Sequence, residues 1–122
     1  MAAYLIAFND EWTPDLTMDE LRERARAAKA VIEEMQAAGV FIFSDGGLDA
    51  STALCSVDAS SGSPVFTDGP FVETKEHLGG FAVVSVADEQ AARLWAGKVA
   101  VACGWPQEVH RFRRAGARPD PT

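Results

Sequence analysis

The chain has 122 residues, of which 48% are hydrophobic, and this is enough for one domain with its own core. Eleven Lys and Arg stand against eighteen Asp and Glu, so the formal net charge is −7. Binding to phosphate needs clustered basic residues, and this balance argues against a nucleic-acid partner. We expect a single domain over residues 1–114 and a flexible tail over residues 115–122.

Targeting signals and metal motifs are missing from the sequence. No apolar run is long enough to span a membrane, and the N-terminus lacks the basic region of a signal peptide. We therefore expect a cytoplasmic protein without membrane contacts, in which Cys55 and Cys103 stay reduced and buried. Two histidines are too few for a three-histidine site and no zinc spacing is present, although a carboxylate-bound ion stays open. No cofactor is indicated.

The elements expected in chain order are short apolar strands and two amphipathic helices. Strands are predicted at 4–8, 40–44, 52–57, 65–67, 80–86 and 108–113. The first helix begins at the capping box of Thr17 and Glu20 and ends at Gly39. Its apolar face is predicted to comprise Met18, Leu21, Ala25, Ala28, Ile32 and Met35, and its charged residues, Lys29 among them, are interpreted as mostly solvated.

The second helix is predicted from Asp88, its N-cap, to about residue 101. Its spacing places Leu94, Trp95 and Val99 on the buried side. Gly97 weakens a helix by about 1 kcal/mol relative to Ala, so close packing against the sheet is the expected reason for it.

This order of elements is an α+β pattern of the ferredoxin-like type, with a β-hairpin inserted between its halves. Two helices cover one face of the sheet. The other face carries Leu5, with Val83 or Val84 and Phe41 or Phe43 depending on register. Because that apolar face needs cover, we expect a second copy to pack on it and form a two-fold homodimer.

A run from Thr67 to Phe81, TDGPFVETKEHLGGF, resembles the DGPFAETKE family, a branch of the YCII-related proteins. The matching residues are Asp68, Gly69, Pro70, Phe71, Glu73, Thr74, Lys75 and Glu76, followed by Leu78, Gly79 and Gly80. Val72 stands where the family usually has Ala. The resemblance extends over nearly the whole chain, to about Arg113.

The resemblance implies a dimeric α/β barrel, a fold similar to that of small enzymes such as muconolactone isomerases. It also implies a cleft with a His and an Asp, the His lying in the first helix. The first helix of this chain contains no histidine, so this pair is incomplete here. Members of the family are also associated with transcription initiation.

The run from Thr67 to Phe81, which we call the key stretch, holds the main candidate site residues. Asp68, with Gly69 and Pro70, is typical of a turn, and the functional interpretation is that its carboxylate also faces a cleft. Glu73 and Lys75 project to one side if the segment is extended, whereas Glu73 approaches Glu76 and His77 if it coils. Such a pair can bind an acidic substrate and abstract a proton, or can simply be a surface ion pair.

The last strand supplies a further candidate. His110 shares a face with Glu108 and Phe112, and is either a structural residue or a base that replaces the missing helix histidine in a cavity between subunits. Ligand contacts are expected from Phe71, His77 and Arg111, the last as an anion holder.

Two functions follow from these residues. The first is the binding of a small carboxylate metabolite in a cleft of a dimeric α/β barrel, with a cofactor-free isomerase or dehalogenase-like reaction as its enzymatic form. The second is a non-catalytic regulatory or accessory dimer, linked to transcription initiation, that contacts a protein partner through the DGPF loop.

Overall fold

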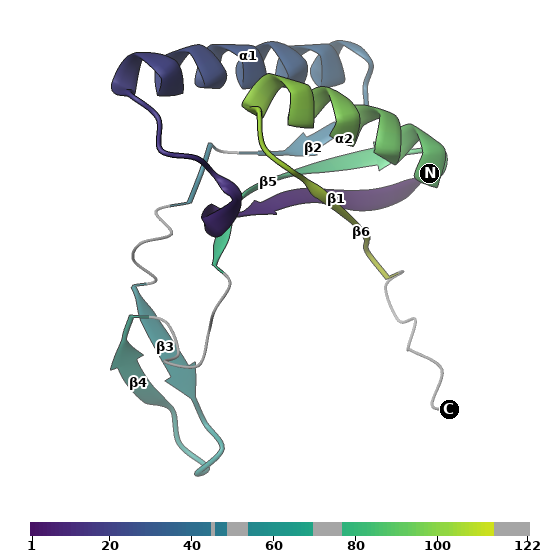
Figure 1. The fold of residues 1–122 in the computed structure, drawn as a ribbon. Coiled ribbons are helices and arrows are strands. Elements are labelled where there is room, and N and C mark those ends of the chain that lie inside the picture. Colours follow the sequence, from purple (N-terminus) through teal and green to yellow (C-terminus); the bar gives the residue numbers. More distant parts are fainter. Residues whose placement is uncertain (45, 49–53, 70–76, 114–122) are drawn as a thin grey trace.

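A four-stranded sheet, two helices and a separate hairpin make up the fold (Figure 1). The computed structural model describes residues 1–44, 46–48, 54–69 and 77–113. In chain order the elements are β1 (Ala2–Asn9), the short 3-10 helix η1 (Asp10–Trp12), α1 (Met18–Ala37), β2 (Phe41–Phe43), β3 (Cys55–Asp58), β4 (Val65–Asp68), β5 (Leu78–Val86), α2 (Glu89–Cys103) and β6 (Glu108–Arg111). The expected tail, 115–122, lies outside the described residues.

The strands of the main sheet are antiparallel and have the order β2-β5-β1-β6. This α+β arrangement is compatible with the expected ferredoxin-like pattern. Strands β3 and β4 pair with each other in a second, two-stranded sheet, inserted between β2 and β5 as predicted. Figure 1 shows both helices on one face of the main sheet, with the hairpin extending away on the opposite side.

The helix ends follow the local signals in the sequence. Thr17 Oγ1 accepts a hydrogen bond from the Glu20 amide at 3.1 Å, and Glu20 Oε1 accepts one from the Thr17 amide at 3.0 Å, so the capping box is confirmed. These bonds hold the pKa of the Glu20 carboxyl below its usual value. Asp88 accepts from the Ala91 amide at 2.9 Å and caps α2 as predicted. Gly39, with a φ of 73°, follows the end of α1.

The core lies between the helices and the sheet. Its buried members are Tyr4, Ile6, Val31, Met35, Val84, Val86, Ala92 and Ala96. The prediction for α2 was wrong at Leu94, which is 65% exposed. Ala92, Ala96 and Cys103 are the buried residues of α2, because positions separated by four and seven residues share a helix face and Leu94 lies on the other side.

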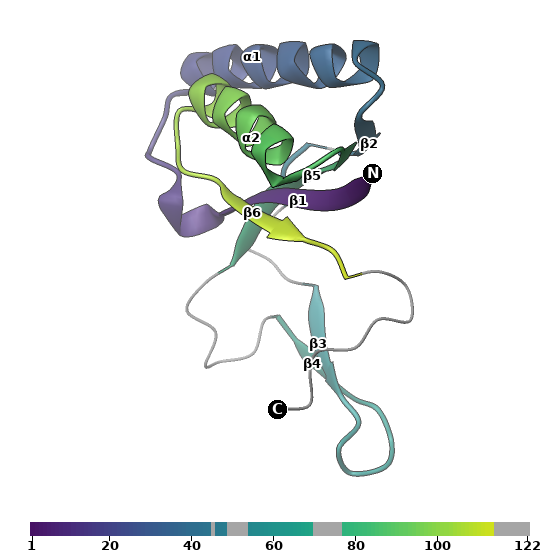
Figure 2. The same ribbon diagram turned by 90° about the vertical axis from the view of Figure 1, so that its right-hand side faces the viewer.

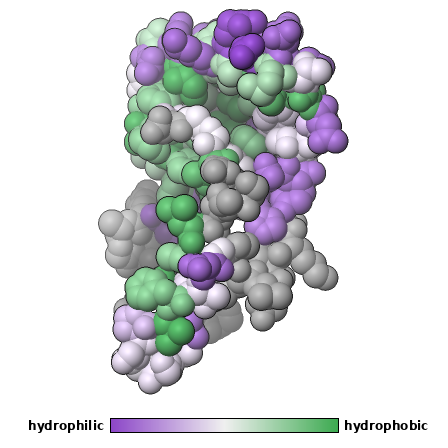
Figure 3. Space-filling model, turned by 90° about the vertical axis from the view of Figure 1, so that its left-hand side faces the viewer, coloured by the Kyte–Doolittle hydropathy of each residue, from purple (hydrophilic) through white to green (hydrophobic). Residues whose placement is uncertain are grey.

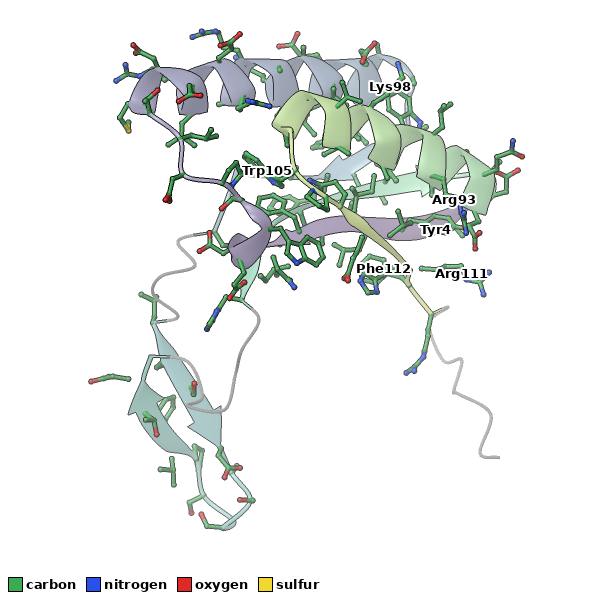
Figure 4. The ribbon with its side chains drawn as sticks, viewed as in Figure 1. Tyr4, Arg93, Lys98, Trp105, Arg111 and Phe112 are labelled. Carbon is green, nitrogen blue, oxygen red and sulfur yellow. The ribbon has the colours of Figure 1, made fainter. Side chains whose placement is uncertain are left out.

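The two helices also contact each other at their surface. Lys98 on α2 lies 3.4 Å from the Glu34 carboxylate of α1, measured between Nζ and Oε1. The same ammonium group lies 5.3 Å from the centre of the Trp95 ring, in cation–π geometry. Figure 4 shows Lys98 at the junction of the two helices.

The face of the sheet without helices carries apolar side chains. The register of the strands shows which of Val83 and Val84, and which of Phe41 and Phe43, lie on it. Val83 pairs with both Leu5 and Phe43, so these three side chains share the helix-free face, whereas Phe41 pairs with Val84 on the core side. The rings of Phe43 and Phe81 lie 6.2 Å apart. The helix-free side of the sheet is turned toward the hairpin in Figure 2. We call Leu5, Phe43, Phe81 and Val83 the open face.

Two further predictions needed correction. Cys103 is buried, but Cys55 is exposed on β3, because the contacts of this strand with other described elements are chiefly with β4. Gly97 does not pack against the sheet: a Cβ built on it meets nothing within 4 Å. Neither described helix has a stretch long and apolar enough to cross a bilayer.

Candidate functional site

A cavity of about 630 Å³ lies between α1 and the sheet, within the range of small-molecule pockets. Its walls come from β1, α1, the end of β2, β5, α2 and the turn after α2. In Figure 3 hydrophobic residues (green) line a hollow beneath the polar outer surface of the helix layer. This cavity therefore lies between the sheet and the helices of one chain.

The predicted apolar face of α1 provides one wall of the cavity. Leu21, Ala25, Ala28 and Ile32 all line it, which explains why Leu21 stays 43% exposed although its spacing is that of a core residue. Met18, at the start of the same stripe, is 63% exposed. Burial in α1 is concentrated near its end, at Val31 and Met35, and Val31 was not expected there. The stripe therefore serves partly as core and partly as cavity wall.

Arg24 brings a positive charge to this apolar wall. The side chain is part-buried and lines the cavity, and its Nη1 donates a hydrogen bond of 3.2 Å to the Cys103 carbonyl at the end of α2. Among the described residues no carboxylate forms an ion pair with Arg24, although acidic residues outnumber basic ones in this chain. Arg22, two positions earlier, instead pairs with Asp19 at 3.3 Å on the exposed side. Besides the capping-box hydrogen bonds, the Arg24 charge helps to lower the pKa of the Glu20 carboxyl one helical turn away, but no described carboxylate lies within ion-pair distance of its guanidinium.

An aromatic pair forms another wall. The Phe8 ring packs against the edge of the Trp105 ring, with centroids 5.4 Å apart and planes at 63°. Figure 4 shows Trp105 between the helix layer and the sheet. Its Nε1 is buried and has no hydrogen-bond partner among the described residues. Burial of such a donor is unfavourable unless it finds an acceptor.

Cys103 contributes a thiol to the same cavity. Burial raises the pKa of this thiol, and the positive charge of Arg24 opposes the rise. The thiol form is therefore favoured at neutral pH, so Cys103 acts as an apolar wall residue.

The predicted site residues on the hairpin and in the key stretch lie elsewhere. Asp68 is exposed at the end of β4 and does not line the cavity. Gly69 has a φ of 81°, as the turn interpretation of this segment requires, and its carbonyl accepts from Ser56 Oγ at 2.6 Å. Phe71, Glu73 and Lys75 are outside the described residues.

His77 lies next to η1. Its Nδ1 forms a short contact with the Glu11 carboxylate, and its amide donates to Glu11 Oε2 at 3.1 Å. The Asp10 amide in turn donates to the His77 carbonyl at 2.7 Å. The side-chain bond from His77, with backbone bonds, holds the pKa of the Glu11 carboxyl below its usual value. His77 therefore joins β5 to η1 and does not line the cavity.

The two candidates on β6 point to different faces. His110 pairs with Leu5 and shares the open-face side, where its Nε2 lies 3.0 Å from Glu108 Oε2. Arg111 pairs with Tyr4 but is exposed at the end of the strand, as Figure 4 shows. Neither lines the cavity. The shared face of Glu108 and His110, predicted from strand alternation, is confirmed.

Arg24, Lys29 and Trp105 are among the cavity residues that sequence reasoning missed. The signal for Arg24 was present, because it lies three residues after Leu21 and four before Ala28, within the apolar stripe. Lys29 was interpreted as part of the solvated face, yet it lines the cavity rim. In the described part of the chain, no cluster of three or more His, Cys, Asp or Glu could hold a metal ion.

Comparison with known protein families identifies the family of this chain. The model of the YCII-related domain matches residues 4–103, which include the sheet strands β1, β2 and β5 and both helices. A comparison with curated proteins gave no match. Because the match extends over most of the chain, the chain belongs to the family of the YCII-related domain.

Proposed function

We propose that this protein binds a small acidic metabolite in the cavity between α1 and the sheet. The observation on which this proposal rests is Arg24, a part-buried guanidinium in a largely apolar cavity without a carboxylate partner among the described residues. A part-buried charge is costly unless it is paired. A ligand carboxylate would supply that partner, and the apolar walls would hold its hydrocarbon part.

Binding is the step that the cavity lining supports directly. The described lining residues include no carboxylate and no histidine that could move a proton. A cofactor-free isomerase or dehalogenase-like reaction is the extension of the proposal, with Glu73 as the acid or base and Lys75 as the cation, because Asp68 and His110 do not line the cavity. We also propose a dimeric α/β barrel, which the apolar open face supports.

The test is a thermal-shift screen of small carboxylates, lactones and hydroxy acids on the wild type and Arg24→Gln. A bound carboxylate is expected to raise the melting temperature of the wild type by mass action, and Arg24→Gln should lose most of that rise. Removing a charge-assisted bond costs about 1.5–3 kcal/mol, or about 10- to 100-fold in affinity.

Arg22→Gln is the matched control, because Arg22 lies in the same helix but pairs with Asp19 in solvent. It should keep the full ligand-induced shift. A carboxylate that stabilises wild type and Arg24→Gln equally would contradict the proposal.

A second candidate function is an accessory dimer that contacts a protein partner. The observation that favours it is the hairpin, which extends away from the sheet and exposes Leu54 at 89% and Phe66 at 68%. Exposed apolar side chains of this size are typical of contact surfaces. This second function is favoured if no carboxylate stabilises the wild type, and if a purified protein that binds the wild type no longer binds Phe66→Ser.

A further inference from the structure

Gly104, the residue after α2, is in direct contact with the guanidinium of Arg24. Its φ is 87°, and a Cβ built on it would lie 1.8 Å from Arg24 Nη1 and 2.8 Å from Cζ. Real Cβ atoms do not approach other atoms so closely, so the guanidinium occupies the space that a side chain at position 104 would need. Any larger residue there must displace Arg24.

Gly39 shows that this contact is not a general property of helix ends. It has a φ of 73° and comes just after Ala38, the C-cap of α1, whereas Gly104 is itself the C-cap of α2. A Cβ built on Gly39, however, meets nothing within 4 Å. Both positions therefore favour glycine for the left-handed backbone, but only position 104 also requires it for the approach of another residue.

The same turn supplies the hydrogen-bond acceptor for Arg24. The Cys103 carbonyl is one of the last carbonyls of α2, which lack a partner within the helix, and it accepts from Nη1 at 3.2 Å. The negative end of the helix dipole also favours a cation here. One edge of the planar guanidinium is thereby fixed, which leaves its other N–H groups to pair with a ligand.

We infer that Gly104 and the Cys103 carbonyl form a seat that positions Arg24 in the cavity, so that Gly104 determines the preference of this site for anionic ligands. This inference rests on the proposed function of the cavity. Gly104 acts through Arg24 and is a positioning residue, not one that touches the ligand. A methyl group at this position would break the hydrogen bond from the guanidinium to the Cys103 carbonyl and would move the guanidinium away from its place in the cavity wall.

The first experiment measures charge preference by calorimetric titration. Benzoate and phenylacetate are each compared with the neutral amide of the same shape, benzamide and phenylacetamide. Wild type and Gly39→Ala should prefer the carboxylates by about 10-fold or more, as expected for a charge-assisted bond. Gly104→Ala and Arg24→Gln should bind acid and amide within about 2-fold of each other. A purely structural role of Gly104 would lower stability without changing this ratio.

The second experiment tests the contact itself and needs no ligand. Melting temperatures are measured for Gly104→Ala and Gly39→Ala, each in the wild-type and the Arg24→Ala backgrounds. In the wild type, Gly104→Ala should lower the melting temperature more than Gly39→Ala does, because it adds displacement of Arg24 to backbone strain. In the Arg24→Ala background the penalty for Gly104→Ala should shrink, whereas the penalty for Gly39→Ala should stay the same.

The outcomes separate this inference from the function on which it rests. If wild type binds acids no better than amides, both are overturned. If wild type prefers acids and Arg24→Gln abolishes the preference, but Gly104→Ala keeps it, the function stands and the seat is overturned. A penalty for Gly104→Ala that is the same in the wild-type and the Arg24→Ala backgrounds would also overturn the seat.

Discussion

At the scale of single residues, Phe8 explains the two glycines that begin β5. A Cβ on Gly79 would lie 2.6 Å from the Phe8 ring, and a Cβ on Gly80 would lie 2.9 Å from it. Glycines in the sheet therefore let an aromatic ring lie flat over the strand and reach Trp105 at the cavity. The sequence showed the pair as the start of an apolar strand. It could not show the reason, because the ring comes from a distant part of the chain.

Arg24 shows that contacts between distant segments were equally hard to predict at the candidate site. Its place in the apolar stripe was readable from helical spacing, but its acceptor, the Cys103 carbonyl, comes from the other helix. The positive φ of Gly69 and the shared face of Glu108 and His110 depend on neighbours in sequence, and both were predicted correctly. Contacts between distant segments were the part that the sequence did not reveal.

The pair of Glu11 and His77 leads to a prediction about pH. The pKa of Glu11 is lowered from 4.5, first by the hydrogen bond from the His77 side chain, so the fold favours the ionised carboxylate. The stabilisation is therefore present above about pH 4.5 and is lost as pH falls through the lower pKa of the folded state. Glu11→Gln should be less stable than wild type near pH 6, and the difference should shrink on acidification.

Urea unfolding of both proteins at a series of pH values between about 6 and 3 checks this, where both still fold. Glu23→Gln, on the exposed side of α1, is the control and should follow the wild type closely. A difference between Glu11→Gln and wild type that grows toward low pH would contradict the assignment.

At the scale of elements, local signals located both helices and every described strand, whereas the buried positions of α2 needed the structure. Hydrophobicity favoured Leu94 as a core residue. The sheet instead packs against the small side chains of Ala92 and Ala96, which permit a close approach of helix and strand. A large side chain is not required at the point of closest packing, so residue size alone misassigned the face.

Gly97 supplies the prediction at this scale. It lies in the interior of α2 and has open space around it, so alanine fits without displacing any described atom. Gly97→Ala should raise the free energy of unfolding by about 0.5–1 kcal/mol, because alanine loses less backbone entropy in a helix. Urea unfolding is the measurement. Gly62→Ala is the contrast: its φ is 99°, so alanine there should destabilise. Destabilisation by Gly97→Ala would indicate that this surface packs against something.

At the scale of the whole molecule, the helices leave the open face uncovered. The order of helices and strands predicted from the sequence already required one apolar face without helices, and the register then assigned Leu5, Phe43 and Val83 to it. Among the described elements, β3 and β4 of the hairpin contact chiefly each other. A two-stranded hairpin alone is only marginally stable in water, which favours a second copy that packs near both features.

Phe43 tests the proposed dimer. The side chain is 50% exposed and contacts Phe81 on the open face, so in a monomer Phe43→Glu should cost little. In a face-to-face dimer the new carboxylates would be buried without a partner, and the dimer should dissociate. Sedimentation at micromolar concentration should show a wild-type dimer and a largely monomeric Phe43→Glu. Leu94→Glu, which changes an exposed apolar residue on α2, should remain dimeric. A monomeric wild type, or a Phe43→Glu dimer as tight as the wild type, would show that the open face is not the interface.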